Sequence, residues 1–274
     1  MNFHHIGKRF TAHFISSIIA RIPRGDYEFS REIGELELAA IYLAGRDAST
    51  QLQYHVQMTA LSDREPEKNA SRAARHMPDV VATASPEQLS TSKDYVVFVC
   101  AVLGEMGEQN PHTWLKKTGG TNPTTNVLLQ AQVSREDIKL YGTMEEATFQ
   151  ALELVLSPKG AQRVQYWQAS SSSWGTKRPA SNEIRVPGMV HEGSTMFIGD
   201  DDDADAAVGL DYRLKGVENV YVTGASLWPT SGSWNPTMTM VGLAQHLADN
   251  LTRKPDPPLK TLLESSSKKR KTLN

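Results

Sequence analysis

The chain has 274 residues, of which 39% are hydrophobic and 22% charged, and its formal net charge is −2. This composition is typical of a globular protein with one large domain or slightly more. The near-neutral charge provides no basic field for nucleic acid or an anionic membrane, so neither partner is expected. Cys100 is the only cysteine, which excludes an internal disulfide and a cysteine-based zinc site. It lies in the apolar run "YVVFVCAVLG" and is predicted to be a buried structural thiol.

The N-terminal segment, residues 1–22, predicts a helix or a helix followed by a strand, ended by Pro23 and Gly25. Its basic, polar and apolar residues are mixed and no clear cleavage site follows, so we expect no signal peptide. No apolar run approaches the roughly 20 residues of a membrane-spanning helix. A cytoplasmic location is therefore favoured.

Four further segments predict the sheet. "LELAAIYLAG" is typical of a strand or short helix, and "LQYHVQMTAL" at 52–61 alternates apolar residues with polar ones, among them His55, as in a half-buried strand. "DYVVFVCAVLGEM" and "NVLLQAQVS" predict two more strands, with "KKTGGTNPTT" as a loop between them. Residues 62–92 show little periodicity and predict a surface excursion.

The segment "REDIKLYGTMEEATFQALELVLSP" predicts the clearest helix of the first half. It spaces Met144, Thr148, Leu152 and Val155 on one face, with the acidic pair at 145–146 in the first turn, where the helix dipole favours negative charge. "QASSSSWGTKRPASNEIRVPG" predicts a long polar loop. We therefore expect an α+β fold with a mostly antiparallel sheet from residues about 35–135 and helices on one face.

The C-terminal third holds the candidate chemistry. A turn at 215–219 and a short buried strand at 220–222 precede Gly224 and Ala225, where small residues let a backbone approach a ligand closely. "SWNPTMTM" predicts a helix from Thr237, with Pro236 at its first position and Asn235 as N-cap, or as N-cap and substrate-facing amide together. His191, in a loop rich in small residues, is either a structural histidine or a base.

Several of these segments resemble the glucose-methanol-choline (GMC) family of FAD-dependent oxidoreductases. "HEGSTMFIG" resembles the family's His-x-x-Gly/Cys-Thr-x-x-Met-Gly segment, with Ile198 where Met is usual. "GLDYRLKGVENVYVTGASLWPT" resembles the stretch in which a final strand returns to the flavin domain. "NPTMTMVGLAQHLAD" is similar to the closing Asn-Pro helix, especially that of pyranose oxidase and its relatives, and "IGKRFTAHF" is similar to the Gly-Arg-x-Leu-x-x-His segment.

The resemblance implies FAD as cofactor and an alcohol or sugar as substrate. No metal site is expected. The resemblance also implies that His191 takes the hydroxyl proton and that Asn235 hydrogen-bonds the same oxygen. The residues implied to lie against the flavin are Gly224, Ala225, Pro236 and Thr237, although many relatives carry Asp where this chain has Gly224. We expect three regions: a substrate-binding region at 1–185, the catalytic and flavin-facing segment at 186–254, and a flexible tail at 255–274. The tail's "KKRK" is either a solvated cluster or a nuclear address.

The dinucleotide-binding fingerprint G-x-G-x-x-G does not occur in these 274 residues. The resemblance therefore implies the second half of a flavoenzyme, either truncated or dependent on a flavin-domain chain. Its last segment would expose an apolar face and tend to self-associate. Two alternatives stay open. One is an inactive remnant that serves as a binding or scaffolding module. The other is an α+β hydrolase that uses His191 with Ser194 or Ser233, although no G-x-S-x-G elbow is present.

Overall fold

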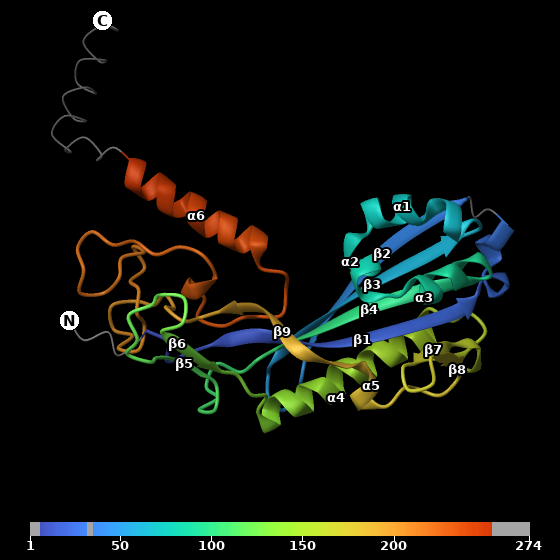
Figure 1. Cartoon of the computed structure of the whole chain (residues 1–274), viewed down its shortest axis with the longest axis horizontal. Helices are drawn as coiled ribbons and strands as arrows, with labels where there is room; N and C mark the ends of the chain where they lie inside the picture. Colours follow the sequence, from blue (N-terminus) through green and yellow to red (C-terminus); the bar gives the residue numbers. More distant parts are fainter. Residues whose placement is uncertain (1–5, 32–34, 254–274) are drawn as a thin grey trace, which may run out of the picture.

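The computed structural model describes residues 6–31 and 35–253. A seven-stranded sheet dominates it, with the order β2-β3-β4-β1-β7-β8 and with β9 also paired to β1 (Figure 1). Every pair of these strands is antiparallel. The strands are β1 (Thr11–Pro23), β2 (Leu36–Arg46), β3 (Gln53–Asp63), β4 (Tyr95–Glu105), β7 (Gln165–Gln168), β8 (Ser173–Gly175) and β9 (Arg185–Gly193). A separate ribbon pairs β5 (Trp114–Lys117) with β6 (Val127–Gln130). The expected α+β class with a mostly antiparallel sheet is confirmed.

Six α-helices accompany the strands in the described part of the chain. They are α1 (Pro66–His76), α2 (Pro78–Thr83), α3 (Pro86–Ser90), α4 (Arg135–Gln150), α5 (Ser181–Ile184) and α6 (Thr237–Thr252). No helix among the described residues is long and apolar enough to cross a membrane.

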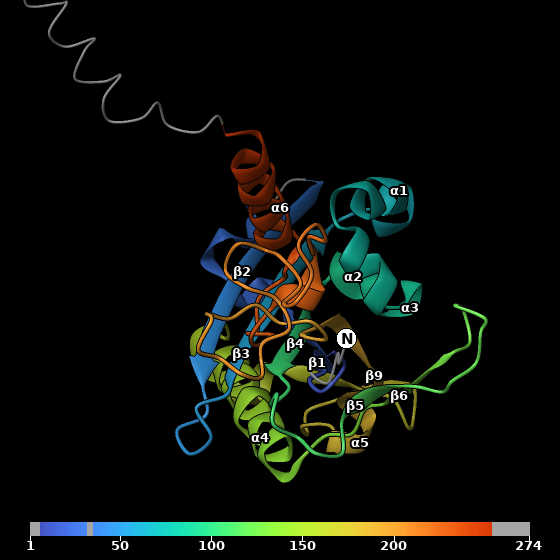
Figure 2. The ribbon, with the colours of Figure 1, turned by 90° about the vertical axis from the view of Figure 1, so that its left-hand side faces the viewer.

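The helices pack on both faces of the sheet, which corrects the expectation of one covered face. Side chains alternate along a strand, so Ile18 and its neighbours two residues away point to one face and Ile19 to the other. Ile18 belongs to the main core with Leu140 and Met144 of α4. Ile19 packs instead in a smaller cluster with Val80 of α2. The short helices and α4 accordingly lie on opposite sides of the strands (Figures 1 and 2).

Helix α4 begins where Ser134 supplies an N-terminal cap. The Ser134 hydroxyl accepts a hydrogen bond from the Asp137 backbone, and the Asp137 carboxylate accepts one from the Ser134 backbone. The helix therefore starts a full ten residues before Glu145, and the placement of 145–146 in its first turn was wrong. Glu145 is instead buried in mid-helix, where it accepts hydrogen bonds from Arg185 and Ser16.

Some segments differ from the expected structure. Residues 11–23 form a strand, as in the second alternative for the N-terminal segment, but no helix precedes it in the described residues 6–10. The expected excursion at 62–92 connects two strands but contains α1, α2 and α3, each with a proline at its first position. The expected loop at 168–188 contains the end of a hairpin, α5 and the start of β9.

Two of the expected strands and the buried cysteine are found, whereas the expected strand at 220–222 is not. The strands over 53–63 and 95–105 are confirmed, and Cys100 is fully buried in the core. Residues 220–222 do not form the expected buried strand. Tyr221 makes one isolated antiparallel bridge with Arg213, and only Val222 of the three residues is buried. The tail predicted at 255–274 lies outside the described residues. β9 hydrogen-bonds to β1, so the first residues of the region expected at 186–254, up to Gly193, belong to the main sheet.

Helix α6 begins at Thr237 as predicted and extends away from the sheet (Figures 1 and 2). Leu247 is its one buried residue, packed with Leu243 against the cluster formed by Val208, Tyr212 and Leu227 and their neighbours. Met238 is 80% exposed and Val241 57% exposed. The helix therefore presents much of its apolar surface to solvent.

Candidate functional site

Three histidines from three different strands meet at one end of the sheet. His13 of β1 lies opposite Glu105 of β4, and His55 of β3 lies opposite Leu103 of the same strand. Because Leu103 and Glu105 are two residues apart, His13 and His55 point to the same face. Their ring centroids are 6.4 Å apart, and both side chains are fully buried.

His191 joins this pair from β9 through a break in strand register. Thr11 pairs with Gly193 and His13 with Val190, so β9 contains one extra residue between these pairs. His191 takes up the irregularity with a φ of +62°, a conformation that a residue with a side chain rarely adopts. Such bulges re-aim side chains and occur often beside active sites. Here the bulge brings Nδ1 of His191 to 2.9 Å from Nδ1 of His13.

A loop from Trp228 to Asn235 covers the histidines. The indole of Trp234 stacks on His55 at 5.1 Å and an interplanar angle of 4°, with Tyr42 of β2 5.7 Å from the same indole. Glu105 holds the loop to the sheet, since its carboxylate accepts hydrogen bonds from the backbone of Gly232 at 3.2 Å and of Gln53 at 2.9 Å. The sequence motif around Asn235 is thereby fixed beside the histidine cluster.

Burial dominates the electrostatics of this cluster. It lowers the pKa of His13 to about 4, with the nearby His191 acting in the same direction. Burial also lowers the pKa values of His55 and His191, opposed in part by the Ser233 backbone and by Glu192 respectively. The three imidazoles are therefore neutral near neutral pH, and each keeps one nitrogen lone pair that can accept a proton.

Asn235 is exposed and is not the N-cap of α6. Pro236 occupies that position, and no side chain caps the helix. Within residues 6–31 and 35–253 the Asn235 amide makes no hydrogen bond, so the capping interpretation is wrong. It lines a hollow of about 390 Å³ together with Trp234, Pro236 and residues of α6, Thr239 and Leu243 among them. His191 does not line this hollow. The ring contacts connect His191 to Trp234, the neighbour of Asn235 in the sequence, only through His13 and His55.

Gly224 and Ala225 run alongside the end of β9. Ser194 donates a backbone hydrogen bond to the carbonyl of Ala225, and Met196 donates one to Ser226. Gly224 has a φ of +94°, and a side chain there would meet nothing within 4 Å, so its backbone faces open space. The backbone amides at the start of α6, from Thr237 on, are likewise not capped by a side chain. The described residues contain no parallel strand pair of the kind that a dinucleotide-binding unit requires.

The serines of the hydrolase alternative do not engage His191. The Ser194 hydroxyl is 2.7 Å from that of Thr11, and both residues are fully buried. Ser233 is also buried, and its hydroxyl makes no hydrogen bond to His191 within the part of the chain that the structure describes. The arrangement gives no support to a nucleophilic serine.

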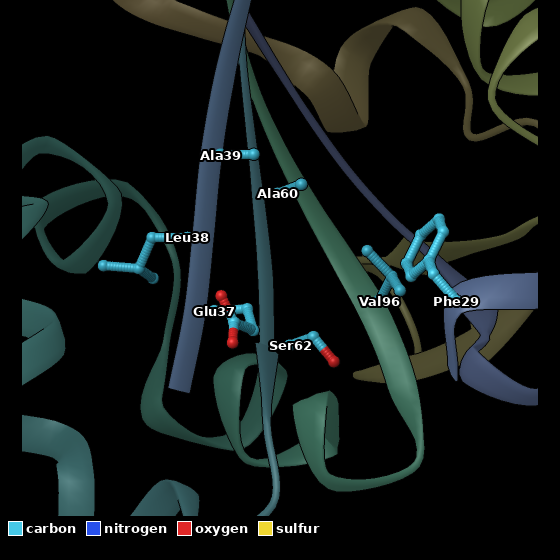
Figure 3. Close-up of a pocket in the computed structure, with 7 residues that line it drawn as sticks. All are labelled: Phe29, Glu37, Leu38, Ala39, Ala60, Ser62 and Val96. Atoms are coloured by element: carbon cyan, nitrogen blue, oxygen red, sulfur yellow. The ribbon is translucent and has the colours of Figure 1, made fainter. Parts of the chain in front are cut away.

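A second hollow of about 350 Å³ lies on the other face of the sheet, far along the strands from the histidines (Figure 3). Val96, Ala60 and Phe29 make it largely apolar, while Leu38 points away from the other labelled side chains. It contains no histidine, and we assign it no catalytic role.

His13 and His55 were not identified as site residues from the sequence. His13 lies inside the segment "IGKRFTAHF", which carried part of the family resemblance, and this was the available signal. His55 belongs to the polar side of an alternating strand, where nothing distinguishes it from a solvated histidine. Trp234 adjoins Asn235, but its stacking on His55 depends on a contact between segments about 180 residues apart.

The comparison with protein families gives one match. The model of the GMC oxidoreductase C-terminal region, described as GMC oxidoreductase, matches residues 39–244, about three quarters of the chain. No curated protein sequence matches the chain. The match spans the middle of the sequence as well as the segments around His191 and Asn235, and the mostly antiparallel sheet with its helices agrees with it. This chain therefore belongs to the GMC oxidoreductase family.

Proposed function

We propose that the chain forms the substrate-binding and catalytic part of an FAD-dependent oxidoreductase that acts on the CH–OH group of an alcohol or sugar. The observation that carries the proposal is the position of His191, half-buried at a strand bulge and in contact with a second, fully buried histidine. Family membership supports FAD as the cofactor. The similarity of the Asn-Pro segment to pyranose oxidases favours a sugar over a simple alcohol.

In this proposal His191 accepts the proton of the substrate hydroxyl, because burial keeps its imidazole neutral near neutral pH. The family resemblance implies that the exposed Asn235 amide, free of other hydrogen bonds in the described residues, donates to the same oxygen. When bound, FAD supplies the acceptor for the hydride that leaves the carbinol carbon. The C–H electron pair thus leaves with the hydride, the O–H proton goes to His191, and a carbonyl product forms.

The dinucleotide-binding fold would come from outside these 274 residues. The exposed apolar side of α6, which includes Met238 and Val241, is the surface we propose for contact with that fold or, in its absence, with a second copy of this chain. Gly224, Ala225, Pro236 and Thr237 would lie against the flavin at the same junction.

The test begins with the purified chain mixed with FAD, gel-filtered and examined for retained flavin absorbance. The same measurement follows on the chain co-expressed with a flavin-domain polypeptide that carries G-x-G-x-x-G. We expect a yellow complex in the second case, and oxidation of at least one member of a panel of sugars and alcohols.

In that complex His191→Ala should lower kcat/KM by about 10²–10⁴-fold, as for loss of a general base. Asn235→Ala should lower it by about 10²-fold. His112→Ala, at an exposed position outside the cluster, is the matched control and should change nothing. Wild-type rates in His191→Ala would refute the catalytic assignment. A folded chain that retains no flavin in either preparation would instead favour an inactive binding module.

A further inference from the structure

His13 and His191 face each other through the same type of nitrogen. Their Nδ1 atoms are 2.9 Å apart, and the rings meet edge to face with centroids 4.9 Å apart. Two protons between these nitrogens would collide, and two lone pairs would repel. One of the two nitrogens therefore donates a hydrogen bond and the other accepts it.

The opposite end of the His13 ring decides which one donates. Nε2 of His13 lies 3.3 Å from the carbonyl oxygen of Ser231. A carbonyl oxygen can only accept, so this nitrogen carries the proton of the neutral ring. Nδ1 of His13 then has a lone pair and accepts the hydrogen bond from His191.

The position of the proton on His13 also determines the tautomer of His191. If Nδ1 of His191 donates to His13, a neutral His191 has its lone pair on Nε2, the nitrogen that faces away from His13. An imidazole in water favours the opposite tautomer, with the proton on Nε2. The contact with His13 therefore selects the less common form and leaves the outward nitrogen free to accept a proton.

We propose that His13 is a positioning residue that holds His191 as its Nδ1–H tautomer and so presents the Nε2 lone pair to substrate. The chain of contacts runs from the Ser231 carbonyl through His13 to His191, across three segments that only the fold brings together. Its catalytic meaning rests on the proposed role of His191 as base, whereas the tautomer itself can be measured without any substrate or cofactor.

Two features make the arrangement rigid. His13 is fully buried, and its strand β1 is held between β4 and β9 at this position. The Ser231 carbonyl is fixed because the adjacent Gly232 backbone donates to the buried carboxylate of Glu105. The loop that carries Asn235 therefore also determines which nitrogen of His13 is protonated.

The test is NMR of the full chain labelled with ¹⁵N-histidine, in which long-range ¹⁵N–¹H correlations distinguish the two neutral tautomers. The eight histidines of the chain give eight sets of ring signals, each with two nitrogens, and His191→Gln identifies the set of His191 by its loss. We expect His191 as the Nδ1–H form and His13 as the Nε2–H form near neutral pH. A His191 ring protonated on Nε2 would overturn the proposal.

Two substitutions separate positioning from packing. His13→Asn retains an acceptor oxygen near the place of Nδ1 and should preserve the His191 tautomer. His13→Phe retains a ring but no acceptor and should return His191 to a mixture dominated by Nε2–H. An unchanged Nδ1–H signal in His13→Phe would contradict the proposal, and if this variant fails to fold, the wild-type signals still decide.

In the flavin-loaded complex, His13→Phe should lower kcat at least tenfold with little change in KM, while His13→Asn should recover most of the loss. If the tautomers are as expected but no preparation oxidises a substrate, the proposed function fails and the His13 contact stands. If substrate is oxidised but His191 carries its proton on Nε2, the proposed function stands and the proposed role of His13 fails.

Discussion

The helices α4 and α6 both have 16 residues, yet their relation to the rest of the molecule is opposite. α4 contains six charged residues and nevertheless buries seven side chains, whereas α6 contains one charged residue and buries only Leu247. α4 also has a complete capping box, while no side chain caps α6. Apolar content alone therefore does not bring a helix into the core. α6 carries a sequence suited to burial on a surface that the described residues do not supply.

The largest expected difference between the two helices is in the cost of truncating a methionine. Met144→Ala in α4 removes a fully buried side chain and should lower the free energy of unfolding by about 2–5 kcal/mol. Met238→Ala in α6 truncates a side chain that is 80% exposed and should change it by less than about 0.5 kcal/mol. Chemical denaturation of both variants measures the difference. Equal losses would mean that α6 is packed in solution, as it would be in a self-associated chain.

The histidine cluster, which joins the sheet to the loop before α6, should make stability depend on pH. His13 in the unfolded chain binds a proton as the pH falls through 6.5, but in the folded chain only near a pKa of about 4. The unfolded state therefore binds more protons between these values, and the free energy of unfolding should fall by on the order of 3 kcal/mol from neutral pH to pH 4. The lowered pKa values of His55 and His191 act in the same direction.

Denaturation curves at a series of pH values check this prediction. His13→Asn removes the largest contribution and should give a shallower dependence. Glu105 opposes the histidines at the acidic end, because burial raises its pKa and its contribution to stability grows as it is protonated. A slope in His13→Asn equal to that of the wild type would place the pH dependence elsewhere.

The N-termini of the two helices should differ by a smaller amount. Ser134→Ala removes the cap of α4 and should cost about 1 kcal/mol. Asn235→Ala should leave stability unchanged within about 0.5 kcal/mol, since the Asn235 side chain makes no hydrogen bond in the described part of the chain. Thermal unfolding of the two variants is a sufficient measurement. A loss of about 1 kcal/mol in Asn235→Ala would restore the capping role that the structure does not support.

The smallest effect on stability and the clearest effect on association are expected for Val241→Glu. The substitution places a charge on the exposed apolar side of α6 and should weaken self-association or binding to a flavin-domain chain without unfolding the protein. Val155→Glu is the matched control, because Val155 is 77% exposed and lies just beyond α4. Sedimentation velocity over a concentration series distinguishes them. If both variants associate alike, α6 is not the contact surface.

The strongly patterned segments were predictable for a local reason. Alternation in 53–63 and the apolar run in 95–105 predict strands because burial of one or both faces depends on side chains within a few residues of each other. The π-helical end of α4 shows where this reasoning stops: Leu152 is buried as its spacing predicts, but Val155 is 77% exposed once the helical step changes at Ala151–Val155. The segments at 62–92 and 168–188 were misassigned because their helices and strands are short and held largely by contacts with the sheet.

By itself the sequence determined the α+β class, the buried Cys100, the start of α6 at Thr237 and, through the segments around His191 and Asn235, the family. These features depend on the local spacing of residues and on short sequence motifs, which can be recognised without knowledge of the fold. Only the tertiary structure decided that His13 and His55 join His191, that Trp234 covers His55, and that Asn235 is free of a capping role. The reason is geometric: these contacts join segments as much as about 180 residues apart through strand register and one bulge, and a shift of one residue would turn each side chain to the other face.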